Sequence, residues 1–155
     1  MEPTFKIARP TDIETLLQFM REYYEFDHLQ FDEEIARAAL AKFIGDDSLG
    51  RLWLIHSRDE AIGYLVLTFG YSLEYGGRDA FIDEVYIRES SRGYGIGTRA
   101  LKFAEEACRA LGVRALHLEV ERANVNALGV YRKVGFVDHD RYLMTKRIFI
   151  KEGQV

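Results

Sequence analysis

The stretch Ser-Arg-Gly-Tyr-Gly-Ile-Gly-Thr at residues 91–98 decides the fold class of this chain. Its three alternating glycines can adopt positive φ angles and let a ligand approach the backbone closely. Residues 81–87, just before it, are rich in β-branched and aromatic side chains, which predicts a strand. Apolar residues recur at helical spacing over residues 98–111, which predicts a helix. Where a glycine turn leads into a helix, the free N–H groups and the positive end of the helix dipole point at any ligand bound in the turn. We therefore expect a site for an anion such as phosphate.

Two better-known phosphate loops do not fit these residues. A P-loop requires Gly-Lys-Ser/Thr, whereas Gly97 is followed by Thr98 and Arg99. A dinucleotide-binding turn requires G-x-G-x-x-G, and no count from Gly93, Gly95 or Gly97 gives that spacing. A Rossmann domain in 155 residues would also lack most of its first half. A nucleotide-binding Rossmann fragment therefore stands only as a rival hypothesis, which predicts binding of NAD and not of CoA.

Two segments together resemble the GNAT superfamily of acyl-CoA-dependent N-acetyltransferases. Residues 92–97 read Arg-Gly-Tyr-Gly-Ile-Gly, similar to the family pattern Arg/Gln-x-x-Gly-x-Gly/Ala. Residues 124–136 read NVNALGVYRKVGF, similar to the family block Asn-x-x-Ala-x-x-x-Tyr-x-x-x-Gly-Phe. The order of the two segments, with one predicted strand between them, also agrees. The resemblance covers about residues 4–150.

The resemblance implies an α/β (α+β) fold of the GNAT type. Its sheet is expected to be mixed and mostly antiparallel, with six to seven strands, four helices and a central pair of strands that splays apart. The sequence patterns place strands at residues 5–9, 51–57, 61–69, 79–87 and 115–121, and helices that begin near Thr11, Asp32, Thr98 and Asn124. Phe136 and residues 142–150 are expected to close the sheet. The chain length predicts a single domain over residues 1–155.

Composition narrows the function classes. The chain is 48% apolar and 30% charged, as in ordinary globular proteins. A net charge of −4 argues against a nucleic-acid partner and weakly favours a cationic substrate. One cysteine, no signal-peptide pattern and no long apolar run lead us to expect a cytoplasmic protein without a membrane partner. The four histidines lack metal-ligand spacing, so we expect no metal.

The resemblance implies acetyl-CoA as a co-substrate. Its pantetheine arm would pair with the backbone of the central strand around Val85 and Ile87, where an N–H group can polarise the thioester carbonyl. The glycine turn would hold its pyrophosphate. The predicted cofactor-binding residues are Val85, Tyr86, Ile87, Arg92, Gly93, Tyr94, Gly95, Ile96, Gly97, Thr98, Asn124 and Ala127. For Asn124, capping the helix that follows is an equally good explanation.

Three side chains are candidates for the chemistry. Tyr131 matches the family's tyrosine, and a phenol with a pKa of about 10 stays protonated at neutral pH, as a general acid must. Asp83 and Glu84 are neighbours on the central strand, where side chains alternate between faces unless a bulge intervenes. We prefer Glu84, expected to share a face with Ile82 and Tyr86, as the group that relays the amine proton. The alternatives are a core role for Tyr131 and a cap or arginine pair for one of the acids.

The resemblance implies that the loop after the first helix and the loop after the third strand flank the acceptor site, and in this chain both loops mix aromatic and acidic residues. Residues 23–28 contain Tyr24 and Glu25, and residues 71–77 contain Glu74. Aromatic faces and carboxylates suit a cationic amine, although tyrosines buried under surface loops explain the same pattern.

We therefore expect an N-acetyltransferase that acts on a small cationic amine by direct attack, with Tyr131 as the general acid. A protein or peptide N-acetyltransferase and an acyl-CoA-binding regulatory protein with little catalysis are the alternatives. Fold analogy also allows a homodimer.

Overall fold

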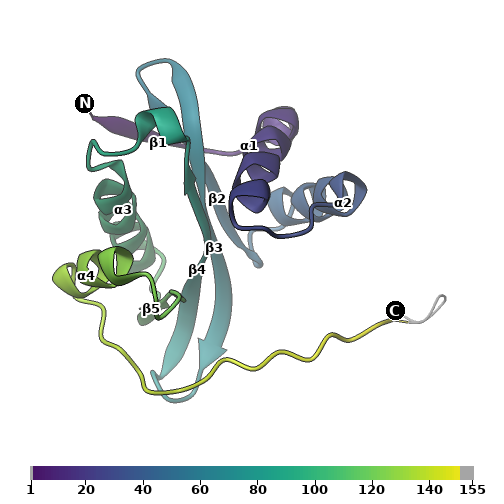
Figure 1. The fold of residues 1–155 in the computed structure, drawn as a ribbon. Helices are drawn as coiled ribbons and strands as arrows, with labels where there is room; N and C mark the ends of the chain where they lie inside the picture. The colour runs from purple at the N-terminus through teal and green to yellow at the C-terminus, as the bar shows by residue number, and fades with distance from the viewer. Residues whose placement is uncertain (1, 151–155) are drawn as a thin grey trace.

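The computed structural model describes residues 2–150, and its central element is a five-stranded sheet in the order β1-β2-β3-β4-β5 (Figure 1). The strands are β1 Pro3–Ile7, β2 Gly50–Ser57, β3 Glu60–Ser72, β4 Gly77–Ile87 and β5 Ala115–His117. The first four pair antiparallel, and β5 pairs parallel to β4. The mixed, mostly antiparallel sheet predicted from the sequence is therefore confirmed in its first five strands.

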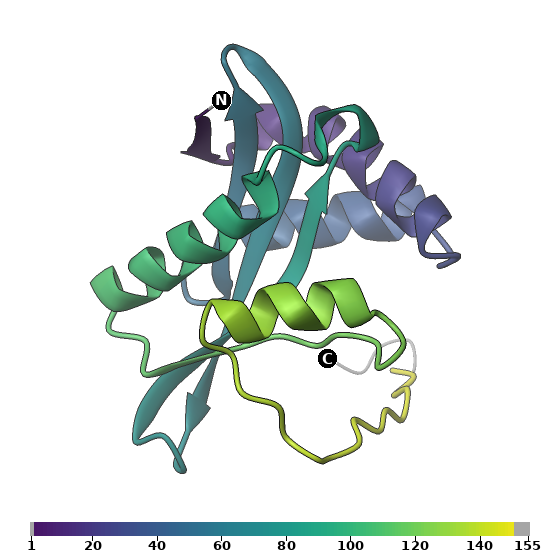
Figure 2. The same ribbon diagram turned by 60° about the vertical axis from the view of Figure 1, so that its left-hand side comes forward.

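Helices cover both faces of the sheet (Figures 1 and 2). They are α1 Ile13–Phe26, α2 Glu33–Ile44, α3 Ile96–Ala110 and α4 Val125–Lys133, with short 3₁₀ turns at Pro10–Asp12 and Glu89–Ser91. The Asp32 side chain accepts a hydrogen bond from the Ile35 N–H at 3.1 Å and so caps α2, as expected for this residue type. Within residues 2–150, no helix has the length and apolar character needed to cross a membrane.

Strand alternation divides the core into two layers. Leu52 and Leu54 of β2 pack with α1 and α2, whereas Trp53 and Ile55 face the other way and pack with α3. The α3 layer also contains the buried Cys108. Two apolar layers of this kind hold the sheet between α1 and α2 on one face and α3 on the other.

The expected closing strands are the main error of the sequence analysis. Residues 136–150 form no helix or strand, and many of their apolar side chains, such as Tyr142 and Met144, are exposed. Within residues 2–150 the sheet therefore has five strands, not six to seven. The predicted strand at 115–121 ends at His117, so β5 exposes only three residues on its outer edge. A strand forms only where a partner offers backbone groups, and so short an edge offers few of them.

A β-bulge interrupts the alternation of β4. Val66 of β3 pairs with Glu84, and Leu67 pairs with Ile82, so Asp83 is an extra residue on β4. Ile82 consequently packs in the α3 layer, whereas Tyr86 packs in the α1 layer. The expectation that Glu84 shares a face with Ile82 is therefore wrong, because the bulge shifts the alternation by one residue.

The close approach of β3 and β4 predicts a strong effect of substitution at Gly63. A Cβ atom there would lie 2.0 Å from the Tyr86 carbonyl oxygen, so Gly63→Ala should lower the free energy of unfolding by about 1–3 kcal/mol or more. Gly129 in α4 is the matched control. Nothing lies within 4 Å of its added Cβ, so Gly129→Ala should raise the same quantity by up to about 1 kcal/mol. Urea unfolding measures both, and a Gly63→Ala variant as stable as the parent would contradict this strand geometry.

Candidate active site

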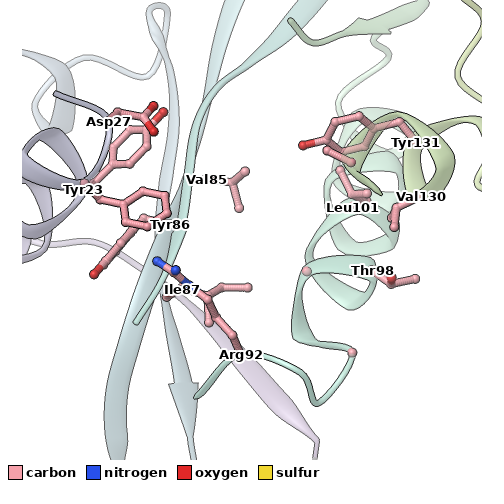
Figure 3. A pocket seen from close by; sticks show the side chains of 14 residues that line it. Tyr23, Asp27, Val85, Tyr86, Ile87, Arg92, Thr98, Leu101, Val130 and Tyr131 are labelled. Carbon is pink, nitrogen blue, oxygen red and sulfur yellow. Dashed lines mark hydrogen bonds between the residues drawn. The ribbon is translucent and has the colours of Figure 1, made fainter. Parts of the chain in front are cut away.

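A cavity of about 390 Å³ lies between β4 on one side and α3 and α4 on the other, and the end of α1 reaches its mouth (Figure 3). It brings together segments that are far apart in the sequence. Its lining residues are Tyr23, Phe26, Asp27, Val85, Tyr86, Ile87, Arg92, Gly95, Gly97, Thr98, Leu101, Ala127, Val130 and Tyr131. We call this cavity the cleft.

An open strand edge forms one wall of the cleft. Within the described residues, β5 pairs with β4 only along residues 79–81, so β4 continues without a partner on that side. The Arg88 N–H donates to the Ile62 carbonyl of β3 at 2.8 Å, which means that the preceding carbonyl, of Ile87, points the other way, into the cleft. Because backbone groups alternate along a strand, Val85 also presents its N–H and C=O there. The backbone of Tyr86 faces β3, and this residue meets the cleft through its side chain.

The glycine turn closes one end of the cleft. Gly93 and Gly95 have φ angles of 85° and 77°, which explains why glycine occupies both positions. Among residues 2–150 no side chain caps α3, and the first hydrogen bond of the helix runs from the Arg99 N–H to the Gly95 carbonyl. The N–H groups of residues 96–98 are therefore free by helix geometry, at the position where the sequence predicts an anion site.

The residues of this turn do not contribute equally. Gly95, Gly97 and Thr98 line the cleft, and a Cβ at Gly97 would lie 3.8 Å from the Ile87 side chain, in the space that a ligand would need. The Ile96 side chain is buried in the α3 layer, and Tyr94 is exposed outside the cleft. Neither side chain lines the cleft, so any role of these residues within it falls to their backbone.

Tyr131 stands on α4 opposite β4. Its hydroxyl points across the cleft towards Val85 in Figure 3, and its ring packs edge-on against Phe136. Partial burial raises the pKa of the Tyr131 phenol, because desolvation disfavours the phenolate. The phenol is therefore protonated at neutral pH and able to donate a proton into the cleft.

Glu84 is held by two tyrosines. Tyr24 of α1 and Tyr64 of β3 each donate a hydrogen bond to one of its carboxylate oxygens, both at 2.6 Å. Desolvation raises the pKa of Glu84 although these hydrogen bonds oppose the shift, and the negative charge of Asp83 raises it further. Among the ion pairs of residues 2–150, none involves Glu84. A desolvated carboxylate without a cation is typical of a binding or catalytic position.

The remaining predicted residues take different places. Asp83 is the exposed bulge residue, yet enough protein surrounds its carboxylate that desolvation raises its pKa. The Asn124 side chain accepts the Ala127 N–H at 3.2 Å, so it caps α4, and it does not line the cleft, whereas Ala127 does. Glu25 borders a second cavity beside Arg88, and Glu74 lies in the turn between β3 and β4, outside both cavities.

Several lining residues were not singled out from the sequence. Leu101 and Val130 have the sequence pattern of ordinary core residues. Only their positions indicate a place in the cleft, because Leu101 follows Thr98 by about one helical turn and Val130 precedes Tyr131. Tyr64 was missed because the register between β3 and β4 decides its contact with Glu84. No group of three or more His, Cys, Asp or Glu side chains suited to a metal ion occurs in the described part of the chain.

The amino-acid sequence is similar to those of known acetyltransferases. The family model described as the acetyltransferase (GNAT) family matches residues 13–136. Thialysine N-epsilon-acetyltransferase of Mus musculus is 29% identical over 139 residues, which is 84% of this chain and 82% of that protein.

Two solved structures have the same fold. An integron cassette protein from the Cole Harbour salt marsh metagenome has a TM-score of 0.83 and 35% identity, covering 95% of this chain and 91% of its own. A predicted acetyltransferase of Clostridium acetobutylicum, solved with acetyl-CoA, has a TM-score of 0.77 and 18% identity, covering 94% and 96%. With a family model that spans most of the chain, this protein belongs to the GNAT family of acetyltransferases.

Proposed function

We propose that this acetyltransferase moves an acetyl group from acetyl-CoA to the primary amine of a small cationic molecule, by direct attack and with Tyr131 as the general acid. The observation that carries the proposal is the position of Tyr131. Its protonated hydroxyl faces the open edge of β4 inside the cleft that ends at the free N–H groups of α3.

The cleft fits acetyl-CoA by its chemistry. The N–H groups of residues 96–98 suit a pyrophosphate, and the N–H and C=O groups of Val85 and Ile87 suit the amides of pantetheine. When bound, acetyl-CoA supplies an activated acetyl carbonyl and a thiolate leaving group. Val85 is the residue whose backbone N–H would polarise that carbonyl, and Tyr131 would protonate the departing sulfur.

The region that we assign to the amine that accepts the acetyl group, called the acceptor side, is acidic and aromatic. Glu84 and Asp83 lie at the bulge of β4, and the rings of Tyr24 and Phe31 meet edge to face beside Glu84. Carboxylates without cationic partners attract an ammonium group, and either can take its proton, directly or through water, before the nitrogen attacks. The mouse relative is named for an amine on a small amino acid analogue, which supports an acceptor of this class.

Tyr131→Phe tests the role of the phenol. Removal of a general acid should lower kcat by about 100-fold or more, while the Kd for acetyl-CoA stays unchanged because the ring still packs. Steady-state kinetics with a panel of amines and calorimetric titration measure the two quantities. Tyr142→Phe, at an exposed position outside the cleft, is the matched control. Full kcat in Tyr131→Phe would exclude this residue as the acid, and binding of acetyl-CoA without turnover of any amine would favour a regulatory protein.

Glu84→Gln separates binding from stability. Loss of a charge-assisted contact worth about 1.5 kcal/mol should raise KM for the amine by about tenfold or more. Burial raises the pKa of Glu84, so the native carboxyl favours its proton, and the parent loses stability as the pH rises from the ordinary value of 4.5 through the native pKa. Gln does not titrate. At pH 7 the variant should therefore melt at the same temperature as the parent or at a higher one. At pH 4 the difference in melting temperature between variant and parent should be smaller, because Glu84 of the parent is then protonated.

Melting curves at both pH values, together with amine kinetics, measure these effects. Glu34→Gln changes an exposed carboxylate on α2 and should leave both the melting temperature and KM nearly unchanged. A Glu84→Gln protein with lower stability at neutral pH and an unaltered KM would show that the carboxylate is purely structural.

A further inference from the structure

Arg92 does not point at the glycine turn that follows it. Its Nε donates a hydrogen bond to the Ile87 carbonyl at 2.8 Å. Its guanidinium carbon lies 4.9 Å from the ring centroid of Phe26 on α1 and 5.6 Å from that of Tyr86 on β4. In Figure 3 the nitrogens of Arg92 point towards Tyr86 and away from Thr98. The side chain thus bridges α1 and β4 across the mouth of the cleft.

In this position Arg92 occupies a backbone carbonyl that the pantetheine arm of an acetyl donor would use. The Ile87 carbonyl is the last acceptor on the open edge of β4 before the chain turns away into the 3₁₀ turn Glu89–Ser91. An arm that pairs with this edge through its amide N–H groups has two outward acceptors, the carbonyls of Val85 and Ile87, and Arg92 occupies the second of them. Arg92 and a pantetheine arm that pairs along the full edge therefore compete for one of these two hydrogen-bond acceptors.

A pyrophosphate can resolve the competition. The exposed Arg92 side chain starts from the residue that precedes Gly93, so rotation about its own bonds can carry the guanidinium towards the N-terminus of α3. A phosphate there offers charged, bidentate acceptors in place of the Ile87 carbonyl and the two rings. A thioester that carries pantetheine but no phosphate offers no such replacement.

We propose that Arg92 determines the donor specificity of this enzyme: it favours CoA thioesters over thioesters of pantetheine alone, because only the former draw it away from the Ile87 carbonyl. The inference rests on the proposed acetyl transfer and adds the recognition of the donor to it. An arginine that only binds phosphate would strengthen CoA binding but would leave donors without phosphate unaffected. The bridge to Ile87, Phe26 and Tyr86 predicts that Arg92 also acts against those donors.

The test compares Arg92→Ala with the parent, using acetyl-CoA and S-acetylpantetheine with the same amine. The variant should lose about tenfold or more in kcat/KM for acetyl-CoA, as a phosphate contact is removed. For S-acetylpantetheine kcat/KM should rise about threefold or more, because the Ile87 carbonyl is released from a charged donor. Arg109→Ala, at an exposed position near the end of α3, is the control and should change neither value.

Calorimetric titration with CoA and with pantetheine keeps the test independent of turnover. Arg92→Ala should bind CoA more weakly and pantetheine more tightly than the parent does. Phe26→Ala, which removes one stacking partner and no charge, should also tighten pantetheine binding. Unchanged pantetheine affinity in both variants would show that Arg92 acts only as a phosphate ligand. Weaker binding of both CoA and pantetheine to Arg92→Ala would show that its role is only structural. Opposite changes in binding without turnover of any amine would uphold the specificity and overturn the acetyl transfer.

Discussion

The unpaired edge of β4 is the constraint on which the rest of the site depends. Backbone N–H and C=O groups removed from water need partners, and β5 leaves the sheet before it can supply them beyond residue 81. Arg92 satisfies one of these groups, the Ile87 carbonyl. The two apolar layers hold β4 in place, so the edge is presented by a rigid element. The free N–H groups of α3 and the Tyr131 phenol then meet the same cleft from the opposite side.

The position of Glu84 has a cost to folding. A carboxylate in the position of Glu84 is desolvated, has an acidic neighbour and forms no ion pair within residues 2–150. Two tyrosine hydroxyls offset part of this cost, and they also tie α1 and β3 to the bulge of β4. Such an arrangement is expected where a cationic ligand completes the charge balance, because sites that bind charge often reduce the stability of the empty protein.

Local patterns predicted the local features. Residue types alone identified β1 to β4, the Asp32 cap of α2, and the glycine turn with its positive φ angles. Resemblance to a family singled out Tyr131, which lines the cleft. Features that depend on the pairing of distant segments were missed or wrong. The bulge at Asp83 can be located only from the register of β3 and β4, and the contact of Tyr64 with Glu84 follows from the same register. The closing strands would have needed a partner edge, and β5 is too short to offer one.

The exposed stretch 142–150 has a consequence for the protein in concentrated solution. Its apolar residues extend along a chain whose own hydrogen-bonding groups face solvent, which is the feature that lets polypeptides add to one another edge by edge. Lys146 and Arg147 interrupt this apolar run in its middle. Two adjacent positive charges repel an identical neighbour laid alongside them, so we expect Lys146 and Arg147 to oppose such association. We therefore expect replacement of these two residues, which do not line the cleft, to make the chain associate more readily.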